Sequence, residues 1–142
     1  MRRGFTLIEV LIVIVVIGIM AGLAVPRAKK WGDRRAVRRA GNEAALFYYR
    51  VRFAAVLKSA TIRIEFAPDL FTAASESPSV SVNVSIPGPA RHGVRLNVSR
   101  SVIRLYPNGL GLGPANTKLV FRRGSAAESL TVSRLGRLKR WE

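Results

Sequence analysis

The sequence contains no cysteine, one histidine and few acidic residues: Asp and Glu number 8 among 142 residues, against 24 Lys and Arg. The absence of cysteine excludes disulfides, thiolate zinc sites, iron–sulfur clusters and thiol nucleophiles. A single histidine argues against most metal-dependent hydrolases and against Ser-His catalysis. We therefore expect no metal, no cofactor and no enzymatic activity.

Apolar residues make up 49% of the chain, which is enough for a folded core, and they are unevenly distributed. Within residues 5–25 only Thr6 and Glu9 are polar. As a helix, this stretch would be about 31 Å long, which matches the hydrocarbon thickness of a bilayer. It is too long for the apolar region of a cleaved secretory signal, about 7 to 15 residues. The segment predicts a membrane-spanning helix.

The residues around the start of this stretch form a specific pattern. Residues 3–10 read Arg-Gly-Phe-Thr-Leu-Ile-Glu-Val. This pattern resembles the class III signal of type IV prepilins and type II secretion pseudopilins. The resemblance implies a leader at residues 1–4, cut by a membrane prepilin peptidase between Gly4 and Phe5, with methylation of the new amine on Phe5. Residues 5–25 would then be the transmembrane and filament-core helix.

Glu9 is the one acidic residue in the apolar stretch. A carboxylate in hydrocarbon costs several kcal/mol unless it reaches the interface or a partner, so Glu9 is a functional candidate. Simple snorkelling to the membrane surface is the alternative. The pilin resemblance implies that the N-terminal amine of a neighbouring subunit neutralises Glu9 during filament assembly.

Gly18, Gly22 and Pro26 interrupt the apolar stretch. The glycine spacing fits the small-xxx-small pattern that brings membrane helices close together. The three residues also weaken a helix, since Gly costs about 1 kcal/mol and Pro about 3 kcal/mol. The resemblance implies a flexible or melted segment here in the fibre, and the sequence leaves both interpretations open.

A second helical segment follows over residues 33–57 and predicts one apolar face. The face consists of Val37, Ala40, Ala44, Phe47, Val51, Ala54 and Leu57. The other faces are basic in the first half and apolar in the second half, where Ala45, Leu46, Tyr49, Phe53 and Val56 lie. We expect a sheet to cover one face and other subunits to cover the rest. Residues 26–58 are thus assigned as the amphipathic half of one long helix.

Residues 59–142 change to a period of two and predict a β-sheet head. Strands are expected at 62–66, 80–86, 94–98, 102–106, 117–122 and 130–134. A long helix followed by short strands predicts an α+β fold, with an antiparallel sheet packed on the helix. This is the pilin architecture, and segments 102–109, 119–121, 130–133 and 136–137 are similar to the GspH/FimT class of minor pilins.

Three other features carry no catalytic or metal chemistry. Only Glu128 and Glu142 are acidic after residue 77, which argues against the calcium loop of major pseudopilins. The glycines at 109, 111 and 113 predict a hairpin rather than a nucleotide site, because Pro114 stands where the fingerprint needs glycine. His92 is expected to be a solvated loop residue.

The C-terminal tail is the second functional candidate. Arg134, Arg137, Lys139 and Arg140 are clustered next to Trp141, an aromatic residue that could stack on a base. Gly136-Arg137-Leu138-Lys139 resembles the Gly-Arg-x-Arg motif associated with DNA binding in FimT-type pilins, with Lys in place of the second Arg. The resemblance implies DNA binding through these four basic residues. Solubility, subunit contacts and, for the basic residues 27–58, lipid phosphates are the alternatives.

The sequence therefore predicts a minor pilin or pseudopilin, a structural subunit of a type IV pilus or type II secretion pseudopilus. Its expected partners are other pilin subunits, the prepilin peptidase, the inner membrane and DNA, with one membrane pass and the head in the periplasm. An alternative is a membrane-anchored binding protein whose basic domain is cytoplasmic. It is favoured by the basic residues over 27–39, which outnumber those of the leader.

Overall fold

The computed structural model describes residues 6–78, 80–113 and 115–141, without the side chain of Leu23. One helix, α1, runs over Leu7–Leu57 and is followed by eight strands and one short 3-10 helix. The chain divides into two compact units, Met1–Gly32 and Asp33–Glu142. The α+β class and the long N-terminal helix predicted from the sequence are confirmed.

The first unit contains the apolar part of α1 and the basic residues Arg27, Lys29 and Lys30 that follow it. By length and composition α1 can cross a membrane, and every described side chain in this part is exposed within the chain. Leu7, for example, is 83% exposed. Such a surface is stable only in an apolar environment or against other apolar surfaces, which agrees with the expected membrane segment.

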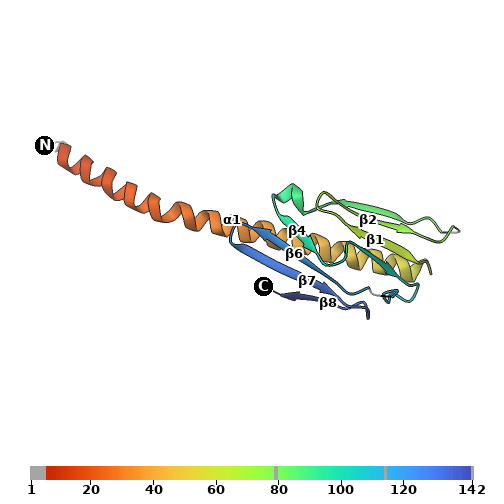
Figure 1. Ribbon diagram of the computed structural model, residues 1–142. Coiled ribbons are helices and arrows are strands. Elements are labelled where there is room, and N and C mark those ends of the chain that lie inside the picture. Colours follow the sequence, from red (N-terminus) through yellow and green to blue (C-terminus); the bar gives the residue numbers. More distant parts are fainter. Residues whose placement is uncertain (1–5, 79, 114, 142) are drawn as a thin grey trace. The chain divides into compact units, whose positions relative to one another are not determined.

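The second unit contains two four-stranded antiparallel sheets beside residues 33–57 of α1 (Figure 1). The first sheet has the order β3-β2-β1-β5 and the second has the order β4-β6-β7-β8. The strands are β1 Ile62–Phe66, β2 Leu70–Ser75, β3 Asn83–Pro87, β4 Arg95–Val98, β5 Val102–Leu105, β6 Thr117–Arg123, β7 Ala126–Val132 and β8 Leu138–Trp141. The 3-10 helix η1, Pro89–His92, connects the two sheets.

The strand predictions were right in part. A single sheet was expected, whereas the described strands form two. Strand β2, Leu-Phe-Thr-Ala-Ala-Ser, was missed because its Ala-Ala-Ser half has low strand preference and breaks the apolar alternation, yet it pairs with neighbours on both sides. Strand β8 was missed because its basic residues resemble a solvated tail. Strand β7 begins at Ala126, four residues before the predicted start at 130.

Both sheets contribute to one apolar cluster with the helix. The predicted helix face is confirmed from Val37 to Val51, whereas Leu57 is 69% exposed. Tyr48 and Ala55 are buried instead, because the true helical period moves the buried face by one position along the last turns. Against the first sheet, the helix contributes Phe47. Its ring lies 6.4 Å from that of Phe66 and 5.9 Å from that of Phe71.

One ion pair and the hydrogen bonds of one arginine connect α1 to the second sheet. Asp33 is 8% exposed and its Oδ1 lies 3.0 Å from Nε of Arg123, at the end of β6. Glu128 on β7 is 4% exposed and accepts a hydrogen bond from Nε of Arg140 on β8. Arg140 also donates to Asn42 Oδ1 at 2.8 Å and to the Arg38 carbonyl oxygen at 3.3 Å, both on α1. Arg140 therefore ties three elements together.

A third ionic contact holds η1 against α1. Oε1 of Glu43 lies 2.6 Å from Nη2 of Arg91, and Oε2 lies 2.8 Å from Nε2 of His92. The prediction that His92 is solvated was wrong, since its side chain is only 15% exposed. The sequence gave no warning because the carboxylate that contacts His92 is 49 positions away along the chain.

The helix approaches the second sheet closely at Gly41. A Cβ there would lie 2.6 Å from Oε1 of Glu128, which its bond to Arg140 holds in place. We expect Gly41→Ala to lower the free energy of unfolding by about 1 to 2 kcal/mol, since overpacking outweighs the better helix propensity of Ala. Gly32→Ala, where nothing lies within 4 Å, is the matched control and should not destabilise. Denaturant unfolding of the full chain in detergent tests this, and equal effects of the two variants would contradict it.

The Glu43 contact predicts a specific acid sensitivity. Burial raises the pKa of Glu43, but the hydrogen bonds and charges of His92 and Arg91 lower the pKa more, so it lies below its usual value. The stabilisation is therefore complete above the unfolded-state pKa of about 4.3 and is lost as the pH falls through the lower folded-state pKa.

We expect Glu43→Gln to cost about 1 kcal/mol at neutral pH. Its difference from the parent protein should shrink below about pH 4. Unfolding free energies measured from neutral to acid pH check this. A difference that stayed constant into strong acid would show that the ion pair does not stabilise the fold.

Candidate functional site

The N-terminal candidate site is described from Thr6 onward, and Gly4 and Phe5 lie outside the described residues. Thr6 precedes α1, and its carbonyl oxygen accepts from the backbone N–H of Glu9 at 3.1 Å. Its Oγ1 accepts from the same N–H at 3.3 Å. Thr6 and Glu9 thus occupy the N-cap and N3 positions, the Thr-x-x-Glu arrangement of a capping box. The Glu9 group that makes these contacts is its backbone N–H.

The Glu9 side chain is exposed within the chain and lies in the first turn of α1. Negative charge there interacts favourably with the positive end of the helix dipole. That interaction is far weaker than the cost of a carboxylate in hydrocarbon. Capping alone therefore does not explain an acid at this place, since Gln can fill the N3 position without a charge.

Gly18, Gly22 and Pro26 lie inside a continuous α1. Pro26 has no backbone N–H, so the carbonyl oxygen four residues earlier, on Gly22, loses its helical partner. A Cβ at Gly18 or Gly22 would have nothing within 4 Å. Packing inside this chain therefore does not require glycine at either position, which leaves contacts with another chain, or helix flexibility, to explain them.

The C-terminal candidates separate in the structure. Arg140 faces the core side of the second sheet and is engaged with Glu128, Asn42 and Arg38. Lys139 faces the opposite side, and its Nζ lies 3.8 Å above the ring of Trp141. Arg137 and Arg134 are exposed in and beside the turn between β7 and β8. Arg140 is therefore a structural residue, whereas Arg137 and Lys139 are available to a ligand.

The glycine of the Gly-Arg-x-Arg-like segment also has a structural reason. Gly136 has φ +74, which favours glycine, and its N–H donates to the Ser133 carbonyl oxygen at 2.9 Å. A Cβ on Gly136 would lie 2.7 Å from the carbonyl oxygen of Gly109 and 2.8 Å from Nε of Arg52. Gly136 is thus explained by the turn, and only Arg137 and Lys139 of the motif remain as evidence for DNA binding.

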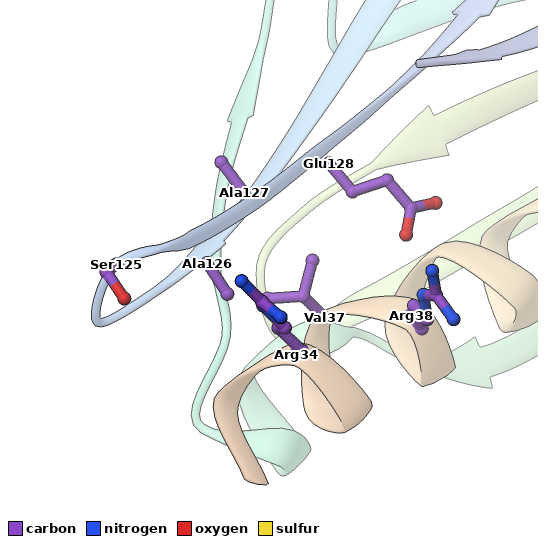
Figure 2. A pocket seen from close by; sticks show the side chains of 7 residues that line it. All are labelled: Arg34, Val37, Arg38, Ser125, Ala126, Ala127 and Glu128. Carbon is purple, nitrogen blue, oxygen red and sulfur yellow. The ribbon is translucent and has the colours of Figure 1, made fainter. Parts of the chain in front are cut away.

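A hollow lies between α1 and the hairpin of β6 and β7. Figure 2 shows Arg34, Val37 and Arg38 of α1 on one wall, and residues 125–128 on the other. One oxygen of Glu128, Oε2, is buried there without a hydrogen-bond partner. The lining offers no nucleophile beside a base, so it gives no support for catalysis. Across the described residues, no three His, Asp or Glu side chains are grouped to hold a metal ion.

The exposed side of the second sheet carries basic residues that were not predicted as functional. Arg95, Lys118 and Arg122 alternate with buried residues on β4 and β6 and are exposed. Alternation was the available signal, but only strand pairing shows that these residues share a face with Lys139.

Comparisons with known proteins agree with the N-terminal segment and the fold. Residues 1–25 match the family model described as the prokaryotic N-terminal methylation motif. No curated protein matches the chain in sequence.

Two crystal structures of the type IV minor pilin FimU from Pseudomonas aeruginosa PAO1 are similar in fold. The first has a TM-score of 0.61 at 16% identity and covers 75% of this chain and 88% of FimU. The second has a TM-score of 0.58 at 15% identity and covers 74% and 92%. The methylation motif and the pilin fold together support a protein of the type IV pilin family.

Proposed function

We propose that the protein is a minor pilin, a structural subunit of a type IV pilus. The observation that carries this proposal is the exposed apolar surface of α1 over the described side chains of residues 7–25. Thr6 and Glu9 lie at its start, and residues 1–25 match the methylation motif. In this proposal the peptidase removes residues 1–4 and methylates Phe5. The helix anchors the subunit in the inner membrane, with the head in the periplasm, until the fibre takes it up.

An exposed apolar stripe on the second half of α1 supports assembly with other subunits. It consists of Leu46, Tyr49, Phe53, Val56 and Leu57, each 47% to 69% exposed. These residues recur at helical spacing, so they form one continuous strip on the outer side of α1. Neighbouring pilin subunits are the partners that we propose for this strip, since exposed apolar patches mark interaction sites.

The charge on Glu9 is the proposed assembly determinant. We expect Glu9→Gln, which keeps an N3 capping residue but removes the charge, to reduce entry into fibres as strongly as Glu9→Ala. Leader removal should be unaffected in both variants. The measurement is the ratio of subunit in sheared fibres to subunit in the membrane, with intact mass as the check on processing.

Thr6→Ala is the matched control, because it removes the cap and keeps the carboxylate. It should assemble better than either Glu9 variant. If Glu9→Gln assembled normally and Thr6→Ala did not, Glu9 would act through capping and the assembly role would be wrong.

DNA binding is a second proposed function, favoured by exposed Arg137 and Lys139 and by a formal net charge of +16. A type II secretion pseudopilin would share the N-terminal chemistry, and a cytoplasmic basic domain would share the charge. A topology reporter fused to the C-terminus distinguishes the cytoplasmic domain from the pilin. We expect the reporter to lie in the periplasm if the protein is a pilin.

A further inference from the structure

Strand pairing gathers basic residues on the exposed face of the second sheet. Arg95 on β4 is directly opposite Arg122 on β6, and Lys118 is opposite Thr131. Thr131 is in turn opposite Lys139 on β8. The side chains of this row and of the Arg95–Arg122 row point away from the core, because the alternate residues Leu96, Leu119 and Phe121 belong to it. We call this surface the basic face and define its cationic residues as Arg95, Lys118, Arg122 and Lys139.

The described strand positions of the basic face carry no acidic side chain. The positions between the basic residues are Asn97, Val120, Ala127, Ser129 and Thr131, and Trp141 ends the middle row. The acids of the described second unit lie elsewhere: Asp33, Glu43 and Glu128 in the contacts with α1, and Glu65, Asp69 and Glu76 on or beside the first sheet.

The exposed face of the first sheet gives an internal comparison. There Arg63 lies directly opposite Arg104, but Nε of Arg104 lies 2.8 Å from Oε1 of Glu76, and Glu65 shares the face with Arg63. Charges of both signs thus balance on one sheet and not on the other. A general excess of basic residues does not by itself produce this difference between two faces of one head.

The Arg95–Arg122 pair costs stability. Directly opposite residues of an antiparallel pair have Cβ atoms about 5 Å apart, and like charges at this spacing are destabilising. Among the described residues, no carboxylate lies within ion-pair distance of either guanidinium. An external anion that bridges the two guanidinium groups would relieve this repulsion and would therefore be bound favourably.

We propose that the basic face binds the phosphate backbone of duplex DNA without sequence preference. This rests on the proposed DNA binding and assigns it a surface. The two basic rows are four residues apart along β6, or about 13 Å, so one duplex, with a charge every ~1.7 Å of axis, reaches both. Two hollows lie along this face, one lined by Arg95 and Arg122 and one by Arg137, Lys139 and Trp141.

A duplex fits better than a single strand or a membrane. Single-strand binders stack bases on several aromatic residues, whereas Trp141 is the one aromatic on the described face and the Lys139 ammonium covers it. The positions between its cations are polar at Asn97, Ser129 and Thr131 and small and apolar at Val120 and Ala127, so Trp141 is the one large apolar side chain of the described face that could insert into lipid.

The test uses the full chain in nanodiscs of neutral lipid and a fluorescent duplex of mixed sequence. We expect salt-dependent binding, and we expect Arg95→Gln with Arg122→Gln to lower the slope of log K against log salt by about 2. Affinity near physiological salt should fall about 10-fold or more. The matched control is Arg50→Gln with Arg63→Gln, which removes the same charge from exposed sites outside the basic face and should retain most of the affinity.

Thermal unfolding of the same variants separates binding from folding. Because the Arg95–Arg122 repulsion disappears, the double variant should be as stable as the parent or more stable. Loss of binding with unchanged or raised stability supports the basic face.

Three outcomes overturn the proposal. If the parent protein does not bind duplex, DNA binding itself fails. If the parent binds and both double variants lose affinity equally, DNA binding stands and the assigned surface is wrong. If the parent binds anionic vesicles and not duplex, the face is a lipid surface.

Discussion

Two sheets and one helix face share a single apolar cluster, and the folded head depends on this arrangement. Each sheet has only four strands, and no described strand of one pairs with a strand of the other. Neither could exclude water from both sides of its inner residues alone. The face of α1 from Val37 to Ala55 supplies the apolar surface that buries the inner residues of both sheets. The helix is therefore part of the head core over this length, while its apolar first part has no core to join.

The scarcity of acidic residues decides where the positive charge is left unpaired. Asp33, Glu43 and Glu128 each form an ion pair with an arginine where α1 meets the second sheet or η1. Arg123, Arg91 and Arg140 are thereby engaged in contacts that hold the head together. The surplus that remains is exposed, and part of it is concentrated on one sheet. The basic residues thus divide into those that stabilise contacts with α1 and those that stay exposed.

Periodicity predicted much of the fold. The α+β class was correct, and of the seven predicted positions on the helix face five are buried, Ala54 packs partly buried against the core and Leu57 is exposed. Burial on one side of a helix imposes a repeat that is visible locally. Strands β2 and β8 were missed because alanines and basic residues carry no strand preference, and only pairing partners distant in the chain make them strands. The division into two sheets depends on pairing order, which a single sequence does not encode locally.

The candidate sites, like the strands, could be predicted where the pattern is local in sequence and not where it depends on the folded chain. The pattern around Gly4, Phe5 and Glu9 is contiguous, so the sequence alone could identify it. Its capping geometry at Thr6 required coordinates. The basic tail was identified by composition, but composition cannot tell which side of a strand a residue occupies. Lys139 and Arg140 are adjacent in sequence, yet they face opposite sides of the second sheet.

The proposed pilin function requires a mature protein that begins at Phe5. Intact-mass measurement of the protein extracted from membranes of the native cell tests this most directly. We expect a mass that lacks residues 1–4 and carries one added methyl group, located on Phe5 by fragmentation. A protein that retains Met1 and has an unmodified Phe5 would contradict the account, since Glu9 would then have no methylated amine of a neighbour to meet.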